Sequence, residues 1–468
     1  MLITSMSFAA LVLGVLAVFY LVPRPAQLLL LLAASYGFYA TWSWTFPVGL
    51  LALTAVNYMI GRRLWSAPSL PWLVAGIALN IASLATLKYS SGFVTAVLHA
   101  TGALGPHQML QLLLPVGFSY RVLENISFLV DASRRQFDGF PRFLDFALYL
   151  AWFPKLLSGP IERGKAFFAQ LARPVVVDNE VLARAATLIA TGMARKLLLA
   201  DSLRALLPVT LFTDPPPRGG VALVFWLLAD VFVIYNDFAG YTDIARGVSL
   251  TFGIDLPRNF TQPFFARNFS ELWMRWHISL SMWLRDYVYL PLSRALLRRS
   301  ASAKSAAALV LPPLAAMLVS ALWHQVKWHT LAWGALWGIF LFLGRIPTLW
   351  RQVVPPDRWP RWRQVLGSLG VVAMLTGSNL LFEMNFRVAG EFLRAAAAPA
   401  HWLPGMFTAI LLILSSLALD WIQARASDDT AFHRWPTWAR SALLAAVLLA
   451  VFVTTRLSVP EPFIYQGF

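Results

Sequence analysis

The chain has 468 residues, of which 58% are hydrophobic and 13% are charged, and its formal net charge is +16. Soluble domains contain about 45–50% apolar and about 25% charged residues, so this composition predicts a polytopic membrane protein. The positive charge does not indicate nucleic-acid binding, because Lys and Arg collect in the cytoplasmic loops of membrane proteins and no soluble basic domain is present. Since the chain has no cysteine, disulfides, zinc–cysteine sites and thiol nucleophiles are excluded.

Apolar stretches of roughly 20 residues predict membrane-spanning helices, and hence an all-α protein with roughly 11–13 spans. They lie near residues 7–22, 26–42, 46–60, 71–87, 109–130, 143–158, 183–211, 220–240, 306–323, 328–346, 364–382, 403–420 and 439–457. We expect the first to be a retained helix, because no basic segment precedes it and further apolar segments follow directly. Pro and Gly interrupt several stretches, which predicts half-helices or re-entrant segments. After one such interruption, at Pro160, we expect Glu162 and Arg163 to pair locally.

Arginine distribution orients the C-terminal half of the chain. One short loop carries Arg345, Arg351, Arg358, Arg361 and Arg363, and another carries Arg425, Arg434 and Arg440. Two predicted spans separate these loops, so both fall on the same side of the membrane, which the positive-inside rule assigns to the cytoplasm. The loop from Glu383 to Trp402 and the tail after Thr455 then face outward.

Residues 241–300 are too polar for a simple span and too aromatic for a water-exposed loop. From Glu271 to Tyr289, apolar residues recur at helical spacing, namely Leu272, Trp276, Leu280, Trp283, Leu284 and Tyr287. This spacing predicts one amphipathic helix that lies in the membrane interface or dips into it. We expect a cavity beside this interfacial or re-entrant segment.

Two histidines lie in tryptophan-rich, largely apolar stretches, Trp276-His277 and Trp323-His324. An ionisable side chain is costly in a bilayer, so each marks a candidate functional site. A neutral imidazole accepts a proton as a general base must, and His324 is a candidate to deprotonate a hydroxyl that attacks an acyl thioester or ester. From the residues alone, a structural histidine hydrogen-bonded inside the bundle explains His324 equally well. For His277 the alternative is a buried histidine that bonds Ser279, Ser281 or Asp286 and holds the amphipathic helix in place. His329 does not share a helical face with His324, which argues against a zinc pair.

Carboxylates at membrane depth should each have a partner. Asp237 and Asp243 flank Gly240, where they either line a cavity or belong to the packing of a helix end around the glycine. We expect Asp286 to form a buried ion pair with the adjacent Arg285, although this carboxylate could also orient an imidazole.

The tail at residues 458–468 is aromatic and prolyl, with the sequence Pro460-Glu-Pro-Phe-Ile-Tyr465-Gln-Gly-Phe468. The arginine distribution places it outside the cell. It could fold back and plug a cavity, which would leave Tyr465 as a buried phenol.

Five stretches occur in a fixed order: "LPVGFSYRVLENISFLVD" (114–131), "WFPKLLSGPIER" (152–163), "DFAGYTDIARG" (237–247), "GIDLPRNFTQPFFARNFSELWMRWHISLSMWLRDYVYLPL" (253–292) and "LVSALWHQVKWHTLAWGALWGI" (318–339). On these residues, which span most of the chain, it resembles the bacterial branch of the membrane-bound O-acyltransferase (MBOAT) family. That branch includes the membrane subunit of alginate O-acetylation and the D-alanyl transferase of the teichoic-acid pathway. The resemblance implies a single MBOAT domain over residues 1–468, in which a ring of transmembrane helices plus interfacial and re-entrant helices surrounds a central tunnel.

The resemblance also implies functional residues: a catalytic His324, a second functional histidine at His277 and no metal ligands. The ending "PFIYQGF" resembles that of alginate-type proteins and that of the small partner protein in D-alanylation, whose tyrosine is proposed as an acyl relay. Tyr465 is therefore a third candidate catalytic residue. The residues expected to bind substrate or line the tunnel are Asp237, Asp243, Asn259, Trp276, Arg285, Asp286, Trp323, Gln325 and Lys327.

The chain departs from the family pattern at three places. Gln325 replaces the usual glycine after the catalytic histidine, and the later His-Gly is Trp337-Gly338. Ser293-Arg294 replaces a double glycine that is frequent in acetyl-transferring relatives, which favours a divergent or D-alanyl-like member.

The function expected from the resemblance is transfer of a short acyl group, preferably acetyl, across the bacterial cytoplasmic (inner) membrane for O-acylation of an exported cell-surface glycan. No cofactor is expected to stay bound, since the acyl donor is an acyl-CoA or acyl carrier protein thioester. The expected partners are this cytoplasmic donor, an extracytoplasmic SGNH-type transferase and membrane lipid. D-alanyl transfer from a carrier protein is the close alternative, and a non-enzymatic conduit or scaffold is the third.

Overall fold

The computed structural model describes residues 1–101, 115–215, 219–299, 306–346, 354–399 and 405–442, together with 444, 445, 447 and 449. Every regular element in these residues is a helix, which confirms the all-α class. Among them, five helices are long and apolar enough to cross a membrane, at Leu70–Lys88, Val221–Leu250, Ala307–His324, Arg361–Glu383 and Met406–Ala426. The prediction of a multi-pass membrane protein is confirmed. Tyr465, the tail 458–468 and most of the predicted span 439–457 lie outside the described residues.

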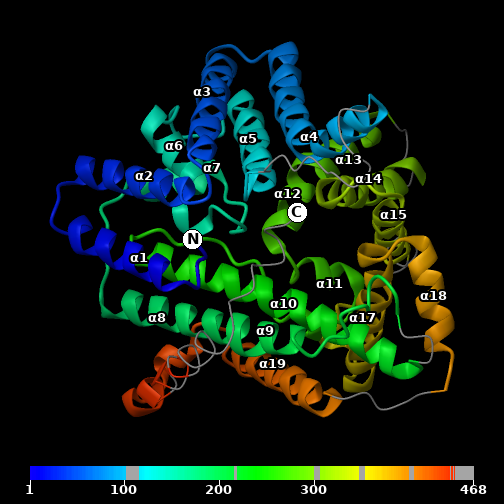
Figure 1. Cartoon of the computed structure of the whole chain (residues 1–468). Helices are drawn as coiled ribbons and strands as arrows, with labels where there is room; N and C mark the ends of the chain where they lie inside the picture. The colour runs from blue at the N-terminus through cyan, green and yellow to red at the C-terminus, as the bar shows by residue number, and fades with distance from the viewer. Residues whose placement is uncertain are drawn as a thin grey trace. The chain divides into compact units, whose positions relative to one another are not determined.

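The first of two compact units contains residues 1–182 and 248–256. Its helices are α1 (Met6–Phe19), α2 (Arg24–Ala40), α3 (Thr45–Ser66), α4 (Leu70–Ala100), α5 (Phe118–Ser133), α6 (Phe143–Ala151), the 3-10 turn η1 (Phe153–Lys155) and α7 (Gly164–Leu171). Helices α3 and α5 lie side by side (Figure 1), and Gly61 permits the contact because a Cβ there would collide with the ring of Phe128. Phe128 stacks on Phe146 of α6 at 4.0 Å between ring centroids, so aromatic packing joins the three helices.

The second unit contains the described residues from 183 to 247 and from 257 onward. Its helices are α8 (Asn179–Met193), the π-helix η2 (Ala194–Ala200), α9 (Asp201–Arg204), α10 (Val221–Leu250), η3 (Pro263–Phe265), α11 (Phe269–Trp273), α12 (Ile278–Leu284), the π-helix η4 (Arg285–Tyr289), α13 (Leu290–Arg299), α14 (Ala306–His324), α15 (Trp328–Leu343), η5 (Pro356–Arg358), α17 (Arg361–Glu383), α18 (Phe386–Ala396), α19 (Met406–Ala426) and η6 (Ala431–Arg434). Helices α14 and α15 pack along their lengths (Figure 1). Gly334 makes this approach possible, because a Cβ there would lie 2.7 Å from the carbonyl oxygen of Met317.

Gly240, the glycine between the two aspartates of α10, marks a second close approach. A Cβ at this position would lie 2.7 Å from the carbonyl oxygen of Gly192 and 2.9 Å from the backbone nitrogen of Lys196. The backbones of α8 and η2 therefore approach α10 closely here, so Gly240 is a packing position, although it lies inside α10 and not at a helix end.

The structure corrects two expectations about residues 241–300. The first ten residues belong to α10, which continues to Leu250, so the irregular segment starts only after that residue. The single amphipathic helix expected from Glu271 to Tyr289 is wrong, because the chain there is divided into α11, α12 and η4. The break falls at His277, whose backbone is left-handed; local hydrogen bonds described below outweigh the helical periodicity of the apolar residues.

Candidate active site

His324 is the last residue of α14 and is buried, with 4% of its surface exposed. Its imidazole lies among three aromatic rings of the second unit, with centroid distances of 4.7 Å to Trp323, 5.1 Å to Phe382 and 6.1 Å to Trp333. The site combines a helix end, which frees the backbone to turn, with an apolar surround that excludes water.

His277 stands at the N-cap of α12 with φ of +43°, an uncommon conformation for a residue other than glycine. Hydrogen bonds on either side impose it. The Ile278 backbone N–H donates to the carbonyl oxygen of Asn259 (2.8 Å), and the Ser279 hydroxyl donates to the Asn259 side-chain oxygen (2.6 Å). Two residues further on, the Thr261 N–H donates to the carbonyl of Arg275 (2.9 Å). Backbone strain held by its surroundings in this way is typical of functional sites.

The ring of Trp323 contacts both histidines, because its centroid lies 6.2 Å from His277 and 4.7 Å from His324. On its other side, His277 meets Phe238 of α10 at 4.7 Å. Burial lowers the pKa of His277 to about 3 from its ordinary value of 6.5. This imidazole is therefore neutral at physiological pH. In the described part of the chain, no cluster of His, Asp and Glu is suited to hold a metal ion.

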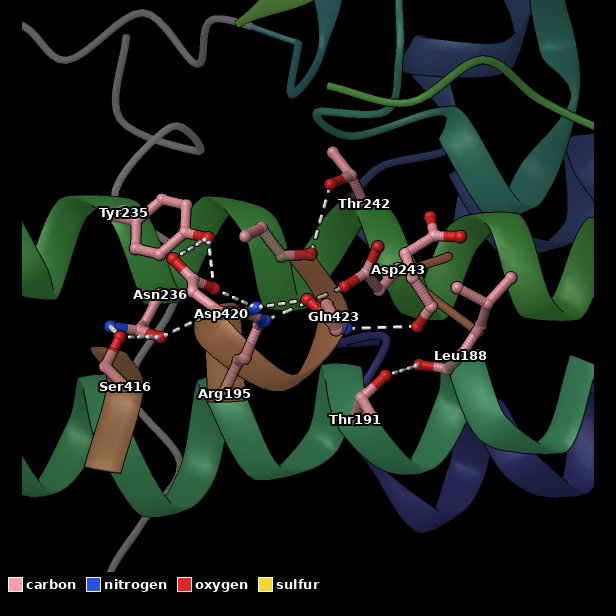
Figure 2. Close-up of polar contacts among 12 residues, drawn as sticks. Leu188, Thr191, Arg195, Tyr235, Asn236, Thr242, Asp243, Ser416, Asp420 and Gln423 are labelled. Atoms are coloured by element: carbon pink, nitrogen blue, oxygen red, sulfur yellow. Dashed lines mark hydrogen bonds and ion pairs between the residues drawn. The ribbon is translucent and has the colours of Figure 1, made fainter. Parts of the chain in front are cut away.

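A buried polar network lies beside this aromatic cluster, and Figure 2 shows its core. Arg195 of the π-helix η2 donates to Asp420 (2.6 Å) and Gln423 (3.0 Å) of α19. The hydroxyl of Tyr235 on α10 donates to the same carboxylate, 2.8 Å from its nearer oxygen. Because Arg195 and Asp420 are 3% and 1% exposed, this is an ion pair removed from water.

Tyr235 belongs to both clusters. Its hydroxyl binds Asp420, while its ring packs on Phe264 at 5.0 Å and on Trp276, the neighbour of His277, at 6.2 Å. The polar network therefore fixes the face of α10 on which the loop bearing His277 packs.

The two aspartates of α10 are both in ion pairs, as their cost at membrane depth requires. Asp237 lies 2.7 Å from Lys196, which is also 2.7 Å from Asp201. Asp243 lies 3.3 Å from Arg246 and 3.9 Å from Arg195. The expectation that each aspartate has a partner is confirmed, and both carboxylates hold helices of the second unit together.

The remaining expected site residues differ in their surroundings. Trp276 and Asn259 are buried next to His277. Gln325, directly after α14, is half-buried, and Lys327, the N-cap residue of α15, is exposed. Arg285 and Asp286 form the expected ion pair at 2.9 Å, with side chains 51% and 31% exposed. The expectation of a buried pair is therefore wrong: Arg285 instead lines a cavity of about 240 Å³ together with Trp273, Tyr289, Met317 and Arg345.

Sequence reasoning missed Asp420, Arg195 and a charged cluster in the first unit. There, Glu124 of α5 pairs with Arg121 at 2.8 Å and with Lys155 of η1, and all three are essentially unexposed. The backbone N–H of Glu162 donates to Glu124 at 3.3 Å, and that of Arg163 donates to the Glu162 carboxylate at 2.8 Å. The available signal was the presence of charges within apolar stretches.

The fold and site define a multi-pass helical membrane protein with a buried histidine pair. A model of the membrane-bound O-acyltransferase family matches residues 31–384, and the chain belongs to this family. It is 34% identical over 340 residues to the probable alginate O-acetylase AlgI of Pseudomonas aeruginosa, covering 70% of this chain and 63% of that protein. It is 28% identical to the peptidoglycan O-acetyltransferase of Helicobacter pylori (67% and 64%) and 29% identical to the teichoic acid D-alanyltransferase of Streptococcus thermophilus (57% and 68%).

These comparisons confirm the resemblance to the membrane-bound O-acyltransferase family seen in the sequence. The chain spans somewhat less than two thirds of the length of the Pseudomonas aeruginosa and Helicobacter pylori relatives. The relatives carry names of both acetyl and D-alanyl transfer.

Proposed function

We propose that the chain transfers a short acyl group, for which acetyl is the leading candidate, from a cytoplasmic thioester donor to an acceptor hydroxyl. The transfer serves O-acylation of an exported cell-surface glycan, and His324 is the general base. The observation that carries this proposal is the burial of His324 among Trp323, Trp333 and Phe382 at the end of a membrane-spanning helix. An ionisable group in such a place is expensive to keep without a chemical task.

The proposed reaction is a direct acyl transfer. A nitrogen of the neutral His324 ring takes the proton of the acceptor hydroxyl as its oxygen attacks the thioester carbonyl carbon. A tetrahedral intermediate forms and collapses, the carbon–sulfur bond breaks, and the imidazolium returns the proton to the leaving thiolate. The protein ends unchanged, and the products are an ester and a free thiol.

His277 has a positioning role in this proposal, since its ring braces Trp323, which in turn contacts His324. We expect His277→Asn, which tolerates the left-handed backbone but lacks the ring, to lower kcat by about tenfold to a hundredfold. We expect His277→Phe, which keeps a ring against Trp323, to recover part of that loss. Because His277 is neutral well above pH 3, neither variant should move the pH–rate profile. If the acidic limb of the pH–rate profile disappeared in both variants, proton transfer would instead be assigned to His277.

Residue Tyr465, outside the described residues, is proposed to relay the acyl group. In this scheme His324 activates the Tyr465 phenol, which takes the acyl group from the donor and passes it to an extracytoplasmic SGNH-type transferase. Tyr465→Phe removes only the nucleophilic oxygen, so we expect export of the acyl group to stop while the protein remains in the membrane at wild-type amounts. Labelled acyl groups on the outer glycan report the result. Continued export in this variant would eliminate the relay and leave direct transfer by His324.

The alternative acyl group is D-alanyl, carried by an acyl carrier protein. Similarity to a teichoic acid D-alanyltransferase supports it, whereas the alginate and peptidoglycan relatives support acetyl. Neighbouring genes for an adenylation enzyme and a carrier protein would favour D-alanyl transfer, and genes for SGNH-type transferases would favour acetyl transfer.

The proposed location is the bacterial cytoplasmic membrane, with residues 1–468 acting as one MBOAT domain around a tunnel. Two membrane-spanning helices, α17 and α19, separate the arginine-rich loops, which supports their placement on one side, proposed to be cytoplasmic. The residues proposed to bind substrate or line the tunnel remain Asp237, Asp243, Asn259, Trp276, Arg285, Asp286, Trp323, Gln325 and Lys327.

Mass spectrometry of the host's surface glycans tests the proposal. Wild type and His324→Ala, at equal membrane levels, should differ by one O-linked acyl group, and its mass identifies acetyl or D-alanyl. Unchanged glycans would count against catalysis by His324 and favour a conduit or scaffold.

A further inference from the structure

A groove of about 740 Å³ opens along the first turns of α17, apart from the histidine pair. Its floor is formed by Leu366, Gly367, Gly370 and Val371, and its polar end by Arg363 and Trp359. A volume of this size is within the range of ligand pockets, about 300–1,000 Å³. From Arg363 to Val371 the groove follows α17 for about 12 Å, at 1.5 Å per helical residue.

Two glycines give the groove its shape. At Gly367, a Cβ would collide with the carbonyl oxygen of Arg267, so α17 meets the segment before α11 here and closes one wall. At Gly370, a Cβ would meet no heavy atom within 4 Å, so this position leaves the floor open. The groove therefore combines the apolar residues of α17 with the polar residues Arg267, Asn268 and Ser270. It lies on a helix that is itself long and apolar enough to span the membrane.

The polar end of the groove is cationic. Arg363 lies over the ring of Trp359 at 4.2 Å from its centroid, a cation–π contact that orients the guanidinium. Among the described residues, no carboxylate lies within ion-pair distance of Arg363, although Arg267 across the groove is paired with Glu271 at 2.8 Å. Arg363 therefore keeps its hydrogen-bond donors available for an anion, and guanidinium groups match phosphate oxygens well.

We propose that this groove binds an anionic glycerophospholipid, with one acyl chain over Gly367 and Gly370 and the phosphate against Arg363. Arginine with tryptophan at the end of an apolar helix is the pattern of a headgroup site. The apolar floor on a membrane-spanning helix selects a lipid over a soluble anion. This inference does not depend on the acyl-transfer chemistry.

The test is native mass spectrometry of the full chain in neutral detergent, titrated with phosphatidylglycerol and, in parallel, with phosphatidylcholine. We expect the wild-type chain to retain phosphatidylglycerol in preference to phosphatidylcholine. Arg363→Gln should weaken the anionic lipid by about tenfold or more, the value of a charge-assisted hydrogen bond. Gly370→Leu should exclude both lipids by filling the floor.

Two matched controls separate the groove from general effects. Gly377→Leu places the same side chain on α17 at another position where a Cβ meets nothing within 4 Å, and Arg394→Gln removes an exposed arginine of α18. Both should bind phosphatidylglycerol like wild type. Equal binding by all five proteins would overturn the proposal. The proposal would also be overturned if Arg363→Gln bound lipid like wild type but had a raised KM for the thioester donor, because that result would assign the groove to the donor.

Discussion

His324→Gln is expected to abolish acyl transfer while the protein still folds and inserts. Glutamine keeps the size and a polar end but cannot accept and return a proton, and a positioned general base contributes about 10²- to 10⁴-fold to the rate. The measurement is transfer of a labelled acyl group from the thioester donor in membrane vesicles. The loss should fall on kcat, because proton transfer belongs to the transition state rather than to substrate binding.

His329 supplies the control for this prediction. It is buried in α15 of the same unit, with Nδ1 2.9 Å from the carbonyl oxygen of Leu381, and it has no place in the proposed reaction. His329→Gln can keep a hydrogen bond to that carbonyl, so we expect most activity to remain. Equal losses in both variants would mean that His324, like His329, has a structural role. Absence of any His324-dependent turnover of the donor would favour the conduit.

Asp420→Ala is expected to cause the largest loss of stability, about 3–5 kcal/mol, the usual cost of leaving a buried charge without its partner. Asp420 accepts hydrogen bonds from Arg195, at 2.6 Å, and from Tyr235. In the variant, the Arg195 guanidinium would keep its hydrogen bonds to Gln423 and Asn236 but would have no carboxylate within hydrogen-bond distance. Thermal denaturation of the purified protein in detergent measures the loss. Asp420→Asn keeps an acceptor and should lose less.

The exposed pair Arg387–Glu391 on α18, at 3.1 Å with side chains 74% and 35% exposed, provides the comparison. Glu391→Ala should change stability by no more than about 1 kcal/mol, since solvent screens such pairs. The double variant Arg195→Met with Asp420→Leu should recover much of the loss, because both charges leave the interior together. Equal, small effects of Asp420→Ala and Glu391→Ala would show that water reaches the network.

The buried polar network around Asp420 is also expected to affect activity, because one of its members contacts the candidate active site. Tyr235 loses its acceptor in Asp420→Ala, and its ring packs beside Trp276 next to His277. We therefore expect the variant to lower acyl transfer even at temperatures where it remains folded.

The helical membrane class, the family and the two histidines could be predicted from the amino-acid sequence, because they depend on local composition and short motifs. Each of the two aspartates of α10 also had to have a partner, since a lone carboxylate at membrane depth is costly. The sequence did not identify those partners. Asp420 is 225 residues from Arg195, and hydropathy gives helices but not which of their faces meet.

The contacts that hold the site in place join distant parts of the chain and could not be predicted from its local patterns. The apolar spacing from Glu271 to Tyr289 fits one continuous helix as well as it fits the separate helices that form. Hydrogen bonds from Ile278 and Ser279 to Asn259 break the helix at His277. The contact of Trp323 with His277 likewise joins residues that are 46 positions apart in sequence. Such contacts depend on the packing of α10, α12 and α14, which no local pattern specifies.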